Sequence, residues 1–323
     1  MVLHVDDFLY GGTVFFHTTI LPRIREIFIV GLEESNSFRY LGLSISEHPD
    51  YIEMSTKGYA SSCKEISTSS LGVDWDRKLS STEITCLKQL SGQLNWVTTQ
   101  SRPDLAFENC MIGNSINKAS VRDVFCANRA LRRLRDHELS LFFPRLNLQT
   151  CSLVGFCDAS FANLPDSGSQ GAFIIFFVDS NGLYCPLAWQ SRRIRRVVHS
   201  TIAAECLAAV EVAETCVFLS KIIQELLSKV PQKIPIHILC DNKSLVDNLH
   251  SSTSVENKCL RIYIHVLRDM YHNHEIHQFK WIPTELQVAN ALTKKGCSSL
   301  YLTQILQGRS KFEFSSGAFV PLN

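Results

Sequence analysis

Three acidic residues in the second half of the sequence lie in or beside predicted strands and a predicted helix, at positions where a carboxylate can bind a metal ion. Asp158 lies within an apolar run, Glu205 in the first turns of a long predicted helix, and Asp241 at the end of a short apolar run. A buried carboxylate is costly unless it is paired or bound to metal, and clustered carboxylates repel one another until divalent cations neutralise them. Three or four carboxylates that hold two Mg²⁺ ions about 4 Å apart suit in-line phosphodiester hydrolysis. A second interpretation stays open on spacing alone, in which the three acids are unrelated and each is satisfied locally.

The elements around these acids predict an α/β module over residues 151–297. Runs of β-branched and aromatic residues between turn residues indicate strands, and apolar residues spaced by three and four indicate helices. The order of these elements is typical of an α/β fold. They are strands at 153–161, 171–179 and 183–191, a helix from 200 or 201 to about 229, a strand at 236–240, helices from 242 and over about 256–272, a strand at 276–281, and a short helix after Pro283.

Short motifs in this module, in the same order along the chain, resemble the ribonuclease H domain of copia-type retrotransposon Pol polyproteins. They are FCDASFA at 156–162, SQGAF at 169–173, LAWQS at 187–191, HSTIAAEC at 199–206, CDNKS at 240–244 and WIPTELQVANALTK at 281–294. The resemblance implies a ribonuclease H-like mixed five-stranded sheet with flanking helices. It further implies hydrolysis of the RNA strand of RNA:DNA hybrids with Mg²⁺, for which Mn²⁺ can substitute. Asp158, Glu205 and Asp241 would then be the catalytic metal ligands.

The same resemblance implies a fourth catalytic acid at the position where this sequence has Asn290. An amide oxygen can ligate Mg²⁺, but it brings no negative charge, so we expect weaker metal binding and reduced or abolished hydrolysis. Two hypotheses of different class follow. The chain is either a ribonuclease H-type endonuclease or a catalytically degenerate retroelement relic that at most binds nucleic acid.

The first half of the sequence extends the resemblance to the family's reverse transcriptase. The motif VDD at 5–7 resembles the turn whose acids bind the catalytic Mg²⁺, which would make Asp6 and Asp7 metal ligands. The family's other polymerase acid lies upstream of this turn, so we do not expect reverse transcription from this chain alone. The implied organisation is a palm remnant at 1–55, a helical thumb or connection at 56–150, the ribonuclease H-like domain at 151–297 and a C-terminal tail at 298–323. Further matching motifs are FRYLG at 38–42, SGQLNW at 91–96 and SRPDLA at 101–106.

Two groups of arginines and one histidine are further candidates for the site. Arginine binds phosphate oxygens well, so both groups are predicted to contact a nucleic-acid backbone, although a solvated surface explains them equally. His274 is predicted to assist proton transfer near the fourth acid position, against the alternative of an ordinary exposed histidine. The arginines are Arg192, Arg193, Arg195 and Arg196 in a loop, and Arg129, Arg132 and Arg133 on a predicted helix.

Composition limits the remaining possibilities. The 323 residues carry 32 Lys and Arg against 31 Asp and Glu, a net charge of +1. This excludes a disordered chain and a polycation that holds nucleic acid by bulk charge. The twelve cysteines contain no C-x-x-C pair and no secretory signal precedes them, which predicts an intracellular protein of the cytoplasm or nucleus. The longest apolar run is too short for a membrane span, and no small-molecule cofactor is expected. Composition does not indicate an oligomeric state.

Overall fold

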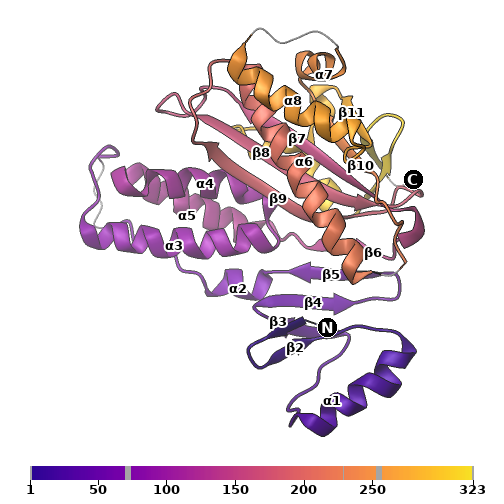
Figure 1. Ribbon diagram of the computed structural model, residues 1–323. Coiled ribbons are helices and arrows are strands. Elements are labelled where there is room, and N and C mark those ends of the chain that lie inside the picture. The colour runs from indigo at the N-terminus through magenta and orange to yellow at the C-terminus, as the bar shows by residue number, and fades with distance from the viewer. Residues whose placement is uncertain (1, 70–73, 228, 252–256, 322–323) are drawn as a thin grey trace.

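A five-stranded mixed sheet forms the centre of the second half of the chain (Figure 1). The computed structural model describes residues 2–69, 74–227, 229–251 and 257–321. The strand order is β11-β10-β7-β8-β9; β7, β8 and β9 form an antiparallel meander, whereas β10 and β11 run parallel to β7. The predicted fold class is therefore confirmed. The strands are β7 (Ser152–Ser160), β8 (Ser169–Val178), β9 (Tyr184–Ile194), β10 (Ile236–Cys240) and β11 (Gln278–Trp281).

Three helices cover one face of this sheet. Every residue of β7 and β8 is buried, because elements pack on both faces of the sheet and each strand reads as a continuous apolar run. A Cβ at Gly155 of β7 would lie 2.6 Å from Val212 Cγ2, so glycine permits the close approach of the long helix α6 to the strand. The helices are α6 (Thr201–Leu226), α7 (Lys243–His250) and α8 (Lys258–His272).

The opposite face of the sheet is covered by the C-terminal segment. Residues 298–323 were expected to be a tail, but within them α9 (Leu300–Leu306) and a hairpin of β12 (Ser310–Glu313) and β13 (Ala318–Pro321) pack on the sheet. The rings of Phe156 and Phe319 stack there with centroids 5.8 Å apart. The single helix expected after Pro283 is two 3₁₀ helices, η5 (Thr284–Leu286) and η6 (Val288–Leu292).

A second, four-stranded antiparallel sheet lies beside this module and crosses the expected boundary at residue 56. Its order is β3-β4-β5-β6, and β6 comes from the region predicted to be a helical thumb or connection. The motif FRYLG at 38–42 lies in the first strand and the turn of a hairpin, whose turn residues Leu41 and Gly42 have φ of 49° and 83°. The strands are β3 (Ser37–Tyr40), β4 (Leu43–Glu47), β5 (Tyr51–Ser55) and β6 (Leu141–Pro144).

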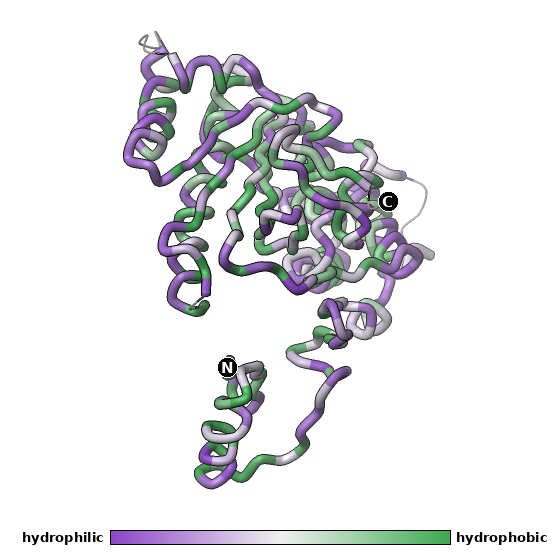
Figure 2. Tube along the Cα trace, turned by 90° about the vertical axis from the view of Figure 1, so that its right-hand side faces the viewer, coloured by the Kyte–Doolittle hydropathy of each residue, from purple (hydrophilic) through white to green (hydrophobic). Residues whose placement is uncertain are grey.

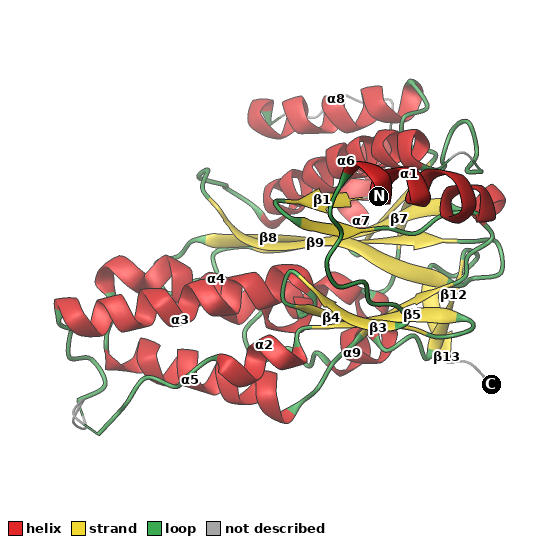
Figure 3. Ribbon diagram, turned by 90° about the horizontal axis from the view of Figure 1, so that it is seen from below, coloured by secondary structure: helices red, strands yellow, loops and turns green. Residues whose placement is uncertain are grey.

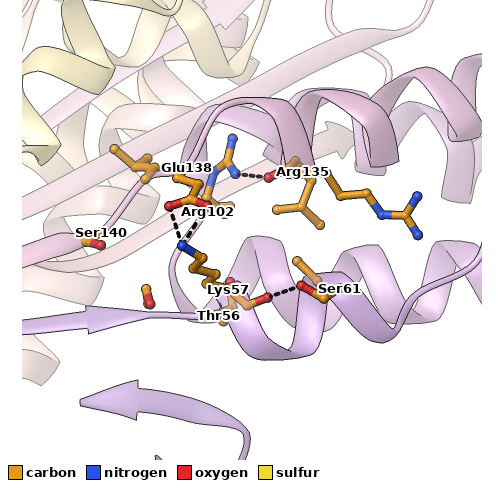
Figure 4. Close-up of a pocket in the computed structure, with 11 residues that line it drawn as sticks. Thr56, Lys57, Ser61, Arg102, Arg135, Glu138 and Ser140 are labelled. Carbon is orange, nitrogen blue, oxygen red and sulfur yellow. Dashed lines mark hydrogen bonds and ion pairs between the residues drawn. The ribbon is translucent and has the colours of Figure 1, made fainter. Parts of the chain in front are cut away.

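Helices beside these two sheets enclose a third core (Figure 3). Helix α3 begins at a capping box in which Ser80 and Glu83 exchange hydrogen bonds, and Arg102 forms a buried two-bond ion pair with Asp104 at 2.8 Å. Arg102 also donates to the Leu134 carbonyl, next to a cavity of about 90 Å³ (Figure 4). This cavity contains none of the predicted site residues. The helices are α2 (Lys57–Ser62), α3 (Ser81–Gln100), η2 (Pro103–Leu105), α4 (Ala106–Ser115), η3 (Ile116–Lys118) and α5 (Val121–Asp136). The short η4 (Leu148–Thr150) follows β6, and its Leu148 packs against the core under α6.

The N-terminal residues pack chiefly against one another at the edge of the molecule (Figure 2). Strands β1 (Val2–His4) and β2 (Asp7–Leu9) form a separate hairpin, followed by the π-helix η1 (Phe16–Ile20) and by α1 (Leu21–Ile27). No helix among the described residues is long and apolar enough to span a membrane. The cysteines whose side chains are described carry free thiols, and Cys259 lies outside that set.

Candidate active site

The parallel strands β7 and β10 bring Asp158 and Asp241 to the same end of the sheet. Cys157 pairs with Cys240 across these strands, so the acids that follow each cysteine are neighbours. Glu205 reaches this end from the first turns of α6, which the Ser200 side chain caps by accepting from the Ala203 amide. The crevice at the carboxyl ends of parallel strands is where α/β folds place ligands. The structure thus gathers the three acids that the sequence singled out.

Glu205 is a buried carboxyl group with an unsatisfied oxygen. It is 4% exposed, and its Oε2 atom has no hydrogen-bond partner. Its carboxylate, Cys240 Sγ and an Asp241 carboxylate oxygen all lie within 4.8 Å of one another. Burial, and then the nearby Cys240, Asp158 and Asp241, raise the pKa of Glu205 to about 10. The metal-free site therefore holds a proton that an isolated glutamate would have lost.

Asp158 has partners of a different kind. It is 1% exposed, and burial raises its pKa, although Lys294 and Thr293 act in the opposite direction. The Thr293 hydroxyl donates to Asp158 Oδ2, and Lys294 Nζ lies 3.5 Å from the same oxygen. Residues alternate between the faces of a strand, and Asp158 shares its face with Phe156, toward η6 and away from α6.

Asn290 lies in η6, and the Lys294 ammonium group links its side chain to that of Asp158. Its Oδ1 accepts a hydrogen bond of 2.5 Å from Lys294 Nζ, and its amide group donates to the Thr284 carbonyl at 3.0 Å. The position of the implied fourth acid is thus held next to the first. Sequence reasoning missed Thr293, Lys294 and Cys240 as members of this site, although all three lie in the quoted motifs.

Two of the predicted groups are not brought to these acids. Asp6 is in the turn and Asp7 at the start of β2, both exposed, in a hairpin that belongs to a different sheet. His274 lies before β11, whereas Asp241 follows β10, and the two strands are parallel. A strand of four residues spans about 10 Å, so His274 is at the opposite end of the sheet. The proton-transfer role predicted for His274 does not fit this position.

The residues at this end of the sheet fit a divalent cation. Carboxylate oxygens are the ligands that Mg²⁺ and Mn²⁺ prefer, and a cation at Glu205 and Asp241 would satisfy the unpartnered Glu205 Oε2. Asp158 adjoins this group closely enough to affect the pKa of Glu205. The Cys240 thiol would add a softer ligand to the same group.

Of the four arginines predicted to lie in a loop, Arg192 and Arg193 lie instead in β9, and Arg195 and Arg196 follow it. All four line a groove of about 690 Å³ between the end of β9, α4, α6 and α8. Arg192 pairs with Glu211 at 2.7 Å and Arg193 with Asp166 at 2.5 Å. The Arg196 guanidinium donates to the Tyr263 hydroxyl, and its carbon lies 5.7 Å from the centre of that ring. Arg195 is exposed and also lines the groove.

The arginines on α5 are arranged differently. Arg133 contacts Glu108 and the Ser299 hydroxyl, each at 2.6 Å, and so joins the helical region to the C-terminal segment. Arg132 pairs with Glu65 at 3.1 Å, and Arg129 is exposed. These ion pairs compete with any contact that Arg132 or Arg133 would make to phosphate.

The strand order, with acids at the ends of β7 and β10, defines a mixed α/β protein with a ribonuclease H-like fold. No family model matches the sequence. The chain is similar to ribonuclease H1 of the archaeon Halobacterium salinarum, with 14% identity over 44% of this chain and 94% of that one, and a TM-score of 0.32. It is similar to LC11 ribonuclease H1, isolated from compost and solved with an RNA/DNA hybrid, with 15% identity over 44% and 94% and a TM-score of 0.34. It is also similar to the foamy viral protease-reverse transcriptase solved with double-stranded DNA, with 15% identity over 85% and 52% and a TM-score of 0.46.

Proposed function

We propose that this chain is part of a copia-type retrotransposon Pol protein whose ribonuclease H-like module hydrolyses the RNA strand of RNA:DNA hybrids. The observation that carries the proposal is the meeting of Asp158, Glu205 and Asp241 at one end of the sheet, where Glu205 Oε2 is buried and unpartnered. The order of the motifs supports the family, and Mg²⁺, or Mn²⁺ in its place, is the proposed cofactor. The proposed location is the cytoplasm or nucleus.

The side chains at this end of the sheet have different roles in such a site. Glu205 and Asp241 would hold the ion together with Asp158, and the Thr293 hydroxyl fixes the orientation of Asp158 Oδ2. When bound, Mg²⁺ supplies an activated water and stabilises charge at the phosphate. Because the pKa of Glu205 is raised to about 10, ion binding near neutral pH releases the proton that this carboxyl holds.

A hybrid cleavage assay tests this function. The full chain is incubated with Mg²⁺ or Mn²⁺ and a hybrid labelled on its RNA strand, beside the Asp158→Asn variant. We expect the variant to cleave about 100-fold more slowly than the unmodified chain, because a buried ligand has lost its charge. Asp247→Asn, an exposed residue of α7, serves as the matched control and should cleave like the unmodified chain. Equal cleavage by the Asp158→Asn variant would place the activity elsewhere.

The second candidate function is that of a degenerate relic that binds hybrids without cleaving them. Asn290 favours it, since the fourth position holds an amide whose oxygen is already occupied by Lys294. Hybrid binding without cleavage in the same assay, under both metals, would support this alternative. Metal ligation by Asp6 and Asp7 stays a prediction, and we propose no reverse transcription by this chain alone.

We also propose that the groove lined by Arg192, Arg193, Arg195 and Arg196 contacts the hybrid backbone. Replacing Arg195 by glutamine should weaken binding and make the slope of log affinity against log salt shallower by about one. The measurement is fluorescence anisotropy of a labelled hybrid in EDTA over a series of salt concentrations. Lys221→Gln removes the same charge from an exposed position on α6 outside this groove and should leave the slope unchanged. Equal effects of the two variants would mean that only overall charge matters.

A further inference from the structure

The side chain of Lys294 lies between the first and the fourth position of the acid set. Its ammonium nitrogen is 2.5 Å from Asn290 Oδ1 and 3.5 Å from Asp158 Oδ2. Asp158 is almost completely buried, whereas the Lys294 side chain is 37% exposed, so the ammonium reaches inward from the surface. The backbone fixes this approach, because Thr293 donates from its amide to the Asn290 carbonyl and from its hydroxyl to Asp158.

The two halves of the site differ in their charge. Asp158 and Asn290 together carry one negative charge, which the single ammonium group of Lys294 neutralises. Glu205 and Asp241 supply two carboxyl groups on the α6 side, and there the Glu205 oxygen Oε2 lacks a partner. A divalent ion that displaces the Glu205 proton would have two carboxylate ligands there and would satisfy this oxygen. Between Asp158 and Asn290 the ion would have the Asn290 amide and the Asp158 carboxylate as ligands. Lys294 already contacts both groups, and its positive charge would repel the ion.

We infer that Lys294 takes the place of one of the two metal ions, so that the chain binds a single divalent cation at Glu205 and Asp241 and uses the Lys294 ammonium as its second cation. This inference rests on the proposed function and refines it. The Asn290 amide belongs to the same arrangement, because an amide oxygen accepts a hydrogen bond from an ammonium group without adding charge that would attract a second metal ion.

The number of bound ions tests the inference without reference to cleavage. The full chain, free of nucleic acid, is titrated with Mn²⁺ by calorimetry, and electron paramagnetic resonance reports whether two bound ions are close enough to couple. We expect one ion on the unmodified chain. The Lys294→Gln/Asn290→Asp double variant should bind a second ion that is spin-coupled to the first. Its affinity for this second ion should be at least about tenfold higher than that of the unmodified chain.

Two variants control for charge and for folding. Lys294→Arg keeps the positive charge and should still bind one ion, whereas Lys295→Gln removes an exposed neighbouring charge and should behave like the unmodified chain. Circular dichroism with a thermal melt establishes that each variant is folded.

The possible results separate the inference from the function on which it rests. Two coupled ions on the unmodified chain overturn the inference but leave the proposed hydrolysis intact. A folded double variant that still binds one ion also overturns it. If no folded variant binds Mn²⁺, both the inference and the metal-dependent hydrolysis fail. One ion on the unmodified chain and two on the double variant support the inference, whatever the cleavage assay shows.

Discussion

Replacing Asn290 by aspartate is expected to increase hydrolysis of an RNA:DNA hybrid by about 10- to 100-fold at limiting Mg²⁺. The change adds a carboxylate beside Asp158, where the amide oxygen now accepts a hydrogen bond from Lys294. A divalent ion gains twice the Coulomb attraction that an ammonium group gains from this added charge, and Lys294 is exposed enough to move away. The gain should therefore appear mainly as a lower Mg²⁺ concentration for half-maximal rate.

Initial rates across a Mg²⁺ titration measure this effect. Asn273→Asp makes the same chemical change in an exposed turn at the opposite end of the sheet and should leave the rates unchanged. Equal and high rates for the unmodified chain and Asn290→Asp would mean that the amide at position 290 does not limit hydrolysis. If neither chain cleaves a hybrid that both bind, the degenerate relic is the better description of this protein.

The end of the sheet that holds Asp158, Glu205 and Asp241 could be predicted because most of it depends on local sequence patterns. The strand expected at 236–240 matches β10, and the acids Asp158 and Asp241 follow from motifs that place an acid late in an apolar strand and just after another. Parallel pairing of neighbouring strands then brings them together. Such features depend on residues close in sequence, and their periodicity is visible without a structure.

The contacts that could not be predicted join distant segments. Strand β6 is four residues long, and four α-helices of the described chain, α2 to α5, separate it from its partner β5. No local pattern therefore predicts the pairing. The position of Lys294 beside Asp158 likewise depends on η6 packing against β7. His274 was assigned by its closeness in sequence to the fourth acid, but β11 carries the chain across the sheet between them. The C-terminal hairpin did have a local signal, in apolar residues around a glycine at φ 73°.

Replacing Glu205 by glutamine is expected to abolish hydrolysis and yet to stabilise the metal-free protein at alkaline pH. Because the pKa of Glu205 is raised to about 10, the folded chain keeps a proton that the unfolded chain loses near pH 4.5. The stability of the metal-free protein should then fall as the pH rises from about 4.5 toward 10. The variant carries no such carboxyl group, so this contribution to the slope disappears.

Thermal melts in EDTA at pH 5, 7 and 8.5 measure the difference. The Tm of Glu205→Gln should exceed that of the unmodified chain by about 5 °C at pH 8.5, with little difference at pH 5. Mg²⁺ should raise the Tm of the unmodified chain, because only its folded form has the site, and should have little effect on the variant. Glu285→Gln changes an exposed glutamate and should follow the unmodified chain at every pH. If instead Glu205→Gln were less stable than the unmodified chain at pH 8.5 without metal, the Glu205 carboxylate would stabilise the fold by itself. Its buried, unpartnered oxygen would then not indicate a cation site.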